Sequence, residues 1–207
     1  MRNLFSSRGN MNLLRCLAQP TRIFRHQGWD IEKQRSIADF LVYILSGEEL
    51  KHSETGRPII NDFTDVSISH KPHYIVVATI QSPYKIGIDI EYLLTDIQTV
   101  FFIGPVIKKN EQFVLDCFCR ENNLSYSSGV IAFWSLKESF FKCLDVDMKP
   151  AQIFVSRIYN EKVFFSFSNS IKECMKERKI QFEYATIEIR GEYVLTQTIM
   201  CEMKKYE

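Results

Sequence analysis

Gly87-Ile88-Asp89-Ile90-Glu91 places two carboxylates one residue apart in an otherwise apolar run. The run predicts a β-strand, in which successive side chains point to opposite faces, so Asp89 and Glu91 share one face. At roughly 3.3 to 3.4 Å per residue, their Cα atoms are expected about 6.5 to 7 Å apart. Both side chains can then reach one hard cation through oxygen ligands. A strand with a solvated acidic face is the alternative, and these five residues alone favour it.

A second stretch, residues 130–144, is almost continuously apolar and predicts a buried helix. Within it, Glu138 and Lys142 stand at positions i and i+4 on one helical face, with Lys137 beside them. An ordinary surface Glu–Lys pair is one interpretation. A charged stripe on so apolar a helix instead indicates that the stripe faces a cleft or a partner. A carboxylate and lysines in a cleft suit a metal ion and phosphates.

The rest of the chain predicts an α+β fold. Asp30 is a suitable N-cap for an amphipathic helix over 31–46, which Gly47 would end. Further helices are expected over 108–120 and 171–178, and strands over 59–60, 66–70, 74–80, 86–91, 153–158, 162–167, 182–189 and 193–203. Each half thus contains a helix followed by antiparallel strands, which indicates two pseudo-symmetric halves, residues 1–94 and 95–207.

Composition excludes several classes of function. The 207 residues carry a formal charge of +1, so no global positive field points to nucleic acid. No uncharged run approaches the roughly 20 residues that span a bilayer, and no apolar signal peptide is visible. None of the six cysteines forms a CxxC pair, so we expect reduced thiols in a cytoplasmic protein. P-loop and dinucleotide-binding glycine motifs and a Gly-x-Ser-x-Gly elbow are absent.

Taken together, residues 87–91 and the later motif at 134–142 (Trp-Ser-Leu-Lys-Glu-Ser-Phe-Phe-Lys) resemble the paired signatures of the 4′-phosphopantetheinyl transferases. Their spacing is similar to that of the larger surfactin-synthetase-activating type. Upstream, Gly56-Arg57-Pro58 resembles the family's Gly-Lys-Pro turn, and residues 67–70 (Ser-Ile-Ser-His) resemble its Asn-x-Ser-His strand. The chain departs from the family pattern at Lys71, where a small hydroxyl residue is usual, and around Asp145, where glycines are usual. Lys71 either adds a phosphate contact or points away.

The resemblance implies two similar α+β halves, each an antiparallel sheet packed with a long helix, with the active site in the cleft between them. It implies transfer of phosphopantetheine from coenzyme A to a serine of an apo acyl or peptidyl carrier protein, with release of adenosine 3′,5′-bisphosphate. It also implies a monomer, because both halves of the cleft lie in one chain. The alternative is a non-catalytic relative that binds coenzyme A or a carrier protein.

The same resemblance implies individual roles. Asp89, Glu91 and Glu138 would hold Mg²⁺, or Mn²⁺, on the coenzyme A pyrophosphate. Asp89, Glu138 and Lys142 would form the catalytic set: Glu138 would assist deprotonation of the serine, and Lys142 would neutralise charge on the leaving phosphate. Contacts to coenzyme A would come from Arg22, Arg25, Arg35, Arg57, Ser69, His70, Lys137 and Lys142.

Overall fold

The computed structural model describes residues 11–12, 30–53, 56–71, 74–93, 106–147 and 149–203. Its helices are α1 (Ile31–Ser46), α3 (Gln112–Glu121), α4 (Tyr126–Leu144) and α5 (Asn169–Glu177), with a 3₁₀ turn at Pro150–Gln152. Its strands are β1 (Met11–Asn12), β2 (Lys51–His52), β3 (Pro58–Ile59), β4 (Thr64–Lys71), β5 (Tyr74–Gln81), β6 (Tyr84–Tyr92), β7 (Ile153–Tyr159), β8 (Lys162–Phe167), β9 (Ile180–Arg190) and β10 (Tyr193–Glu202).

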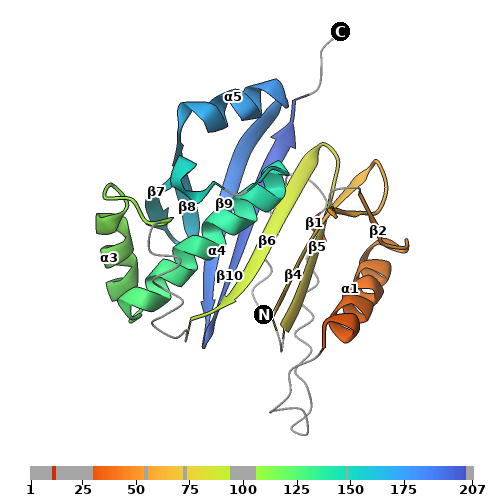
Figure 1. Cartoon of the computed structure of the whole chain (residues 1–207), viewed down its shortest axis with the longest axis horizontal. Helices are drawn as coiled ribbons and strands as arrows, with labels where there is room; N and C mark the ends of the chain where they lie inside the picture. The colour runs from red at the N-terminus through yellow and green to blue at the C-terminus, as the bar shows by residue number, and fades with distance from the viewer. Residues whose placement is uncertain are drawn as a thin grey trace, which may run out of the picture.

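The strands form antiparallel sheets, so the predicted α+β class is confirmed (Figure 1). The largest sheet has the order β6-β10-β9-β8-β7, and a three-stranded sheet has the order β1-β5-β4. β2 and β3 pair as a separate ribbon. In the large sheet, β10 places Thr196 opposite Asp89 and Val194 opposite Glu91.

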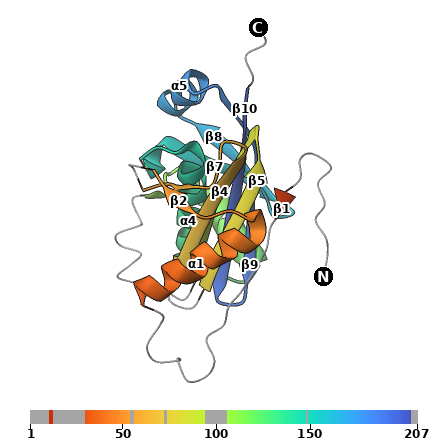
Figure 2. The same ribbon diagram turned by 90° about the vertical axis from the view of Figure 1, so that its right-hand side faces the viewer.

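Each of the two larger sheets carries one long helix. α1 lies against β5, as the view in Figure 2 shows, and α4 crosses β6, β10 and β9. Residues Ala38, Leu41 and Val42 of α1 are buried against Val66 and Ile75 of the smaller sheet. The apolar side chains of α4 are buried in two clusters on the larger sheet. The expected pairing of one sheet with one long helix is therefore confirmed.

The helix boundaries follow from local chemistry. The Asp30 side chain accepts a hydrogen bond from the Lys33 backbone N–H at 2.7 Å, and Gly47 ends α1 in a left-handed conformation with φ 74°. Both end residues agree with the sequence prediction. Ser125 caps α4 through the Ser128 N–H, so α4 begins four residues earlier than the predicted start at residue 130.

The two sheets are joined by side chains of β4. Asp65, Ser67 and Ser69 accept hydrogen bonds from the backbone N–H groups of residues 86, 88 and 90, at 2.8, 3.0 and 3.2 Å. Residues 65, 67 and 69 alternate along the strand and therefore share one face. We call this row of three contacts the side-chain seam. It satisfies the N–H groups on the edge of β6 that β10 does not reach.

Gly87 sets the distance between β6 and α4. A Cβ atom at this position would lie 1.9 Å from the Ser139 carbonyl oxygen and 2.6 Å from the Cys143 nitrogen, both backbone atoms of α4. No rotamer change relieves contact with a backbone atom, so only glycine permits this approach.

β6 belongs to the larger sheet, although it precedes the predicted boundary at residue 94. The strand that carries Asp89 and Glu91 thus packs with the C-terminal strands and directly under α4. The division into residues 1–94 and 95–207 stays a prediction.

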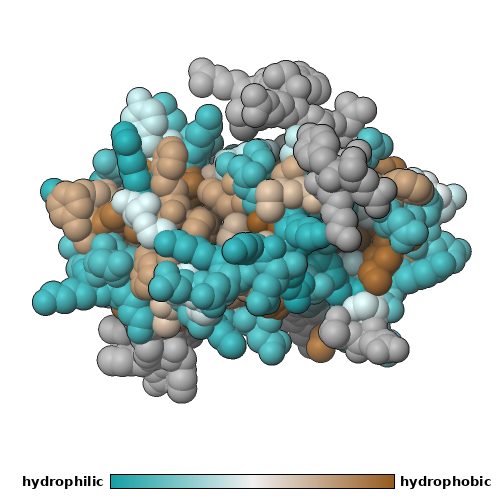
Figure 3. Space-filling model, turned by 90° about the horizontal axis from the view of Figure 1, so that it is seen from above, coloured by the Kyte–Doolittle hydropathy of each residue, from teal (hydrophilic) through white to brown (hydrophobic). Residues whose placement is uncertain are grey.

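Hydrophilic side chains predominate on the face seen in Figure 3, and hydrophobic ones occur there in separate groups. Within the described part of the chain, no helix is both long enough and apolar enough to span a membrane.

Replacing Gly87 by Ala is expected to destabilise the protein by about 3 kcal/mol or more, because overpacking here must displace α4. Urea denaturation measures the loss. Gly191→Ala is the matched control: Gly191 has φ 58°, but its added Cβ would meet no atom within 4 Å. This control should lose only about 1 to 2 kcal/mol, from the left-handed backbone. Equal losses in both variants would contradict the close approach.

Candidate active site

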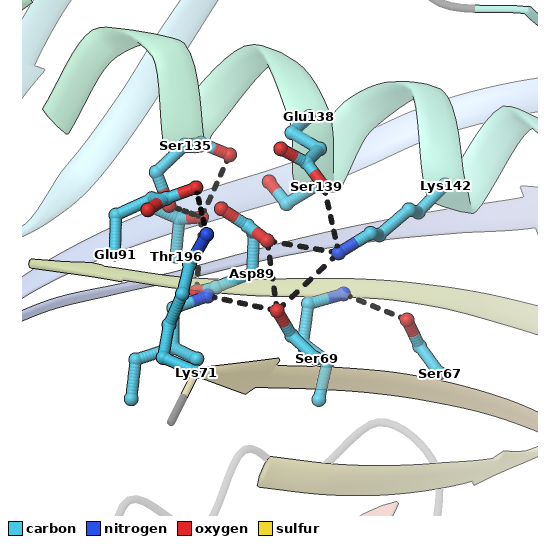
Figure 4. Close-up of polar contacts among 12 residues, drawn as sticks. Ser67, Ser69, Lys71, Asp89, Glu91, Ser135, Glu138, Ser139, Lys142 and Thr196 are labelled. Atoms are coloured by element: carbon cyan, nitrogen blue, oxygen red, sulfur yellow. Dashed lines mark hydrogen bonds and ion pairs between the residues drawn. The ribbon is translucent and has the colours of Figure 1, made fainter. Parts of the chain in front are cut away.

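Asp89 lies at the centre of the site and is almost completely buried, with 1% of its surface exposed. Its Oδ1 accepts hydrogen bonds from Ser69 Oγ and Lys142 Nζ, both at 2.8 Å (Figure 4). Its Oδ2 is buried and has no hydrogen-bond partner among the described residues. Burial raises the pKa of the Asp89 carboxyl, Lys142 opposes this rise and Glu138 adds to it. A buried carboxylate oxygen without a partner is costly unless a cation or donor reaches it.

Glu91 follows Asp89 on the same face of β6. Its Oε1 lies 2.7 Å from Lys71 Nζ, across the gap from β4. Burial raises the pKa of Glu91 to about 7, against the lowering effect of Lys71. Lys71 therefore points towards the acidic residues and not away from them, and a contact with phosphate stays a prediction.

Glu138 and Lys142 reach the site from α4. Lys142 Nζ lies 2.8 Å from Asp89 Oδ1 and 3.1 Å from Glu138 Oε1, so it links the helix to β6. Burial alone would lower the pKa of Lys142, but the two carboxylates outweigh it and raise the pKa. Lys142 is therefore a charged ammonium held at the junction of α4, β4 and β6.

The three carboxylates meet closely enough to hold a metal ion. One oxygen each from Asp89, Glu91 and Glu138 lies within 4.8 Å of the others. Oxygens that share one octahedral Mg²⁺ at 2.0–2.1 Å lie about 2.9 Å apart as cis neighbours and at most about 4.2 Å apart in trans, so binding would draw the three side chains closer together. All three are hard oxygen donors, and the buried Asp89 Oδ2 has no hydrogen-bond partner within the part of the chain that the structure describes. The residues present therefore fit a Mg²⁺ or Mn²⁺ site.

A cleft of about 680 Å³ opens beside these groups. Trp134, Glu138 and Lys142 of α4 form one wall, and the segment Gly56 to Pro58 forms another. Arg57 lines this cleft, and its Nη2 lies 2.8 Å from Asp65 Oδ1. Burial alone would lower the pKa of Arg57, but the carboxylates beside it raise it.

The expected contact of Lys137 with phosphate needs correction. Lys137 Nζ donates to Glu111 Oε2 and to the Val106 carbonyl, both at 2.8 Å, and both charged side chains are fully buried. Glu111 Oε1 also accepts from the Val155 N–H at 2.9 Å. Adjacent residues of a helix point about 100° apart. The Lys137 side chain therefore points into the core, whereas the Glu138 side chain points into the cleft. Its role in the structure is to anchor residues 106–111 and β7 to α4.

The remaining predicted residues are placed as follows. Ser69 supports Asp89, as described above. His70 lies at the surface with its ring partly covered; this partial burial lowers its pKa most, followed by the charges of Lys142, Lys71 and Arg35. Arg35 is exposed on α1. Arg22 and Arg25 lie outside the described residues, so their contacts with coenzyme A stay predictions.

The sequence alone indicates no role for Asp65 and Ser67 in the site, and it gives Lys71 a phosphate contact only as one alternative. Strand alternation was the available signal, because positions 65, 67, 69 and 71 share the face of β4 that meets β6. The motif contains Ser69 and His70 side by side, but adjacent strand residues point to opposite faces, so His70 does not share the face of Ser69.

In protein stripped of metal, the free energy of unfolding is expected to fall as pH rises from about 4.5 towards 7. Because burial raises the pKa of Glu91 to about 7 from its ordinary 4.5, the folded state keeps a proton there that the unfolded chain has released. Glu91→Gln removes this titration, so its free energy of unfolding should fall less over the same pH range. Urea denaturation in EDTA at several pH values measures the free energy of unfolding.

Glu202→Gln is the control, because Glu202 pairs with Lys85 at 3.0 Å outside the acidic cluster and is 49% exposed. Its pH slope should match that of the unchanged protein. If Glu91→Gln has the same slope as well, Glu91 does not titrate as described.

No family model matches this chain, and no curated protein matches it. Solved structures with a similar arrangement include holo-acyl-carrier-protein synthases. The Helicobacter pylori enzyme in complex with coenzyme A is 22% identical with a TM-score of 0.43, over 56% of this chain and 98% of that chain. The Plasmodium yoelii enzyme is 18% identical with a TM-score of 0.45, over 58% and 95%. The Neisseria meningitidis enzyme is 15% identical with a TM-score of 0.45, over 56% and 96%.

The expectation of the larger, surfactin-synthetase-activating type stays a prediction. The structural neighbours of this chain are thus holo-acyl-carrier-protein synthases of low sequence identity.

Proposed function

We propose that this chain is a Mg²⁺-dependent phosphopantetheinyl transferase. It would transfer phosphopantetheine from coenzyme A to a serine of an apo acyl or peptidyl carrier protein and release adenosine 3′,5′-bisphosphate. The convergence of Asp89, Glu91 and Glu138 within 4.8 Å, with Lys142 beside them at a cleft, is the observation that carries the proposal.

This geometry favours phosphoryl-type transfer over other classes. Carboxylates that share a divalent cation suit the pyrophosphate oxygens of a substrate, and an adjacent lysine suits charge that develops on a leaving phosphate. Burial raises the pKa of Asp89, and without such a cation the charge of Glu138 adds to this rise. The two sequence signatures specify the reaction within this class.

Each side chain has a proposed part. Mg²⁺, when bound by Asp89, Glu91 and Glu138, would polarise the pyrophosphate and offset its charge. Glu138 is 28% exposed at the cleft, so it is accessible to accept the proton of the incoming serine hydroxyl. Lys142 would donate to the leaving phosphate. Ser69 would keep Asp89 in place through its 2.8 Å hydrogen bond.

The side chains of Arg35, Arg57 and His70 are proposed to contact coenzyme A, with Arg22 and Arg25 from the segment outside the described residues. Arg57 lines the cleft directly. The protein is proposed to act as a monomer, because the acidic cluster and the cleft are built from one chain.

A non-catalytic relative that binds coenzyme A or a carrier protein is the second candidate. The charged loop at Asp145 to Asp147, where the family has glycines, favours it. The two candidates differ in their dependence on metal: catalysis needs Mg²⁺, whereas a scaffold would bind coenzyme A equally well in EDTA.

Purified protein with coenzyme A and Mg²⁺ is expected to add about 340 Da to an apo carrier protein, with the metal dependence expected of the acidic cluster. Intact-mass spectrometry over a panel of carriers detects the addition, and EDTA should suppress it. A serine-to-alanine carrier is the control. No mass increase on any carrier would reject the catalytic proposal.

Glu138→Gln is expected to lower the transfer rate by about 100-fold or more, because it removes both the proton acceptor and a metal ligand. Thermal unfolding should show that the fold persists, since Glu138 is partly exposed. Glu202→Gln, which removes a carboxylate outside the site, serves as the control and should keep full activity. Full activity in Glu138→Gln would remove this residue from the mechanism.

A further inference from the structure

Asp145 departs from two local preferences at the C-terminal end of α4. It ends the helix in the left-handed region, with φ 57° and ψ 53°, a position that glycine or asparagine usually takes. Its carboxylate also stands at the negative end of the helix dipole, where a cation is preferred. Two unfavourable features at one residue indicate that its side chain makes a compensating interaction.

That interaction is an ion pair with Arg57. Arg57 Nη1 lies 3.2 Å from Asp145 Oδ1, and the same nitrogen donates to the Lys142 carbonyl at 3.1 Å. Arg57 comes from the turn before β3 and Asp145 from the end of α4, so the pair joins two walls of the cleft.

The two carboxylates on Arg57 differ in character. Asp65 is 16% exposed, and its second oxygen accepts the Ile86 N–H of the side-chain seam, so it belongs to the framework. Asp145 is 46% exposed and lines the open cleft. Ion pairs with so exposed a partner are weak. An incoming phosphate can therefore displace Asp145, but not Asp65.

We propose that Asp145 is a specificity-determining residue that competes with the phosphate groups of the co-substrate for Arg57. This inference rests on the proposed function, in which coenzyme A enters this cleft. A phosphate brings more negative charge and more acceptor oxygens than the carboxylate that it replaces, so it forms stronger bonds with the guanidinium. A singly charged ligand gains little from the exchange. The cleft thus selects for polyanionic ligands at the cost of some affinity.

The test compares coenzyme A binding by Asp145→Asn and by the unchanged protein, using calorimetry with Mg²⁺. Asparagine tolerates the left-handed conformation and has nearly the same shape, so the fold should persist. The dissociation constant is expected to fall about three- to tenfold, as the loss of a competing exposed ion pair implies. Raising the salt concentration should shrink this difference.

Asp147→Asn is the matched control. Asp147 lines the same cleft and forms no ion pair with a described residue, so its removal changes the local charge equally without freeing Arg57. Asp147→Asn should change the dissociation constant of coenzyme A by less than about twofold, because solvent and salt screen this charge. Equal tightening by both variants, or no tightening by Asp145→Asn, would overturn the inference while leaving the proposed function intact. No coenzyme A binding by any of the three proteins would overturn the proposed function and this inference with it.

Discussion

The candidate site depends on how the backbone N–H groups along the edge of β6 that does not pair with β10 find hydrogen-bond acceptors. In a continuous sheet, carbonyl groups of a neighbouring strand would accept its N–H groups; here Asp65, Ser67 and Ser69 accept them through side chains. Each such donor left unpaired in the interior would cost about 1–3 kcal/mol. Side chains hold strands farther apart than the 4.7–4.9 Å of a backbone ladder. That spacing lets Lys142 enter from α4 and contact both Ser69 and Asp89.

Electrostatics at the site are balanced locally. Asp89 and Glu91 are each paired with a lysine, from α4 and from β4 respectively. Lysines, unlike arginines, are compact point charges on flexible stems. Under the proposed function, they could therefore move aside for a divalent cation. Both lysines offset the negative charge of the acidic cluster. The near-neutral net charge of the whole chain is compatible with this, because the cations are placed residue by residue.

Much of this arrangement could be predicted from the sequence, and the exceptions have physical reasons. The bounds of α1 follow from Asp30 and Gly47, and the shared face of Asp89 and Glu91 follows from strand alternation. Lys137 could not be placed, because a charged residue on an apolar helix looks the same whether it meets a cleft or a buried carboxylate. Its partner, Glu111, is distant in sequence and is brought to it only by the tertiary fold. The side-chain seam was hidden for the same reason.

The place of β10 between β6 and β9 has a consequence for the order of assembly on the ribosome. Among the described strands of its sheet, β6 pairs with β10 alone, and β10 is synthesised about a hundred residues later. β4, β5 and α1 contain local contacts and can fold early. Both β6, which carries Asp89 and Glu91, and α4 pack against β10. They acquire this support only when residues 193–202 have been synthesised. A ribosome-bound intermediate would accordingly contain Arg57 and Ser69 before Asp89, Glu91 and Glu138 have the support of β10.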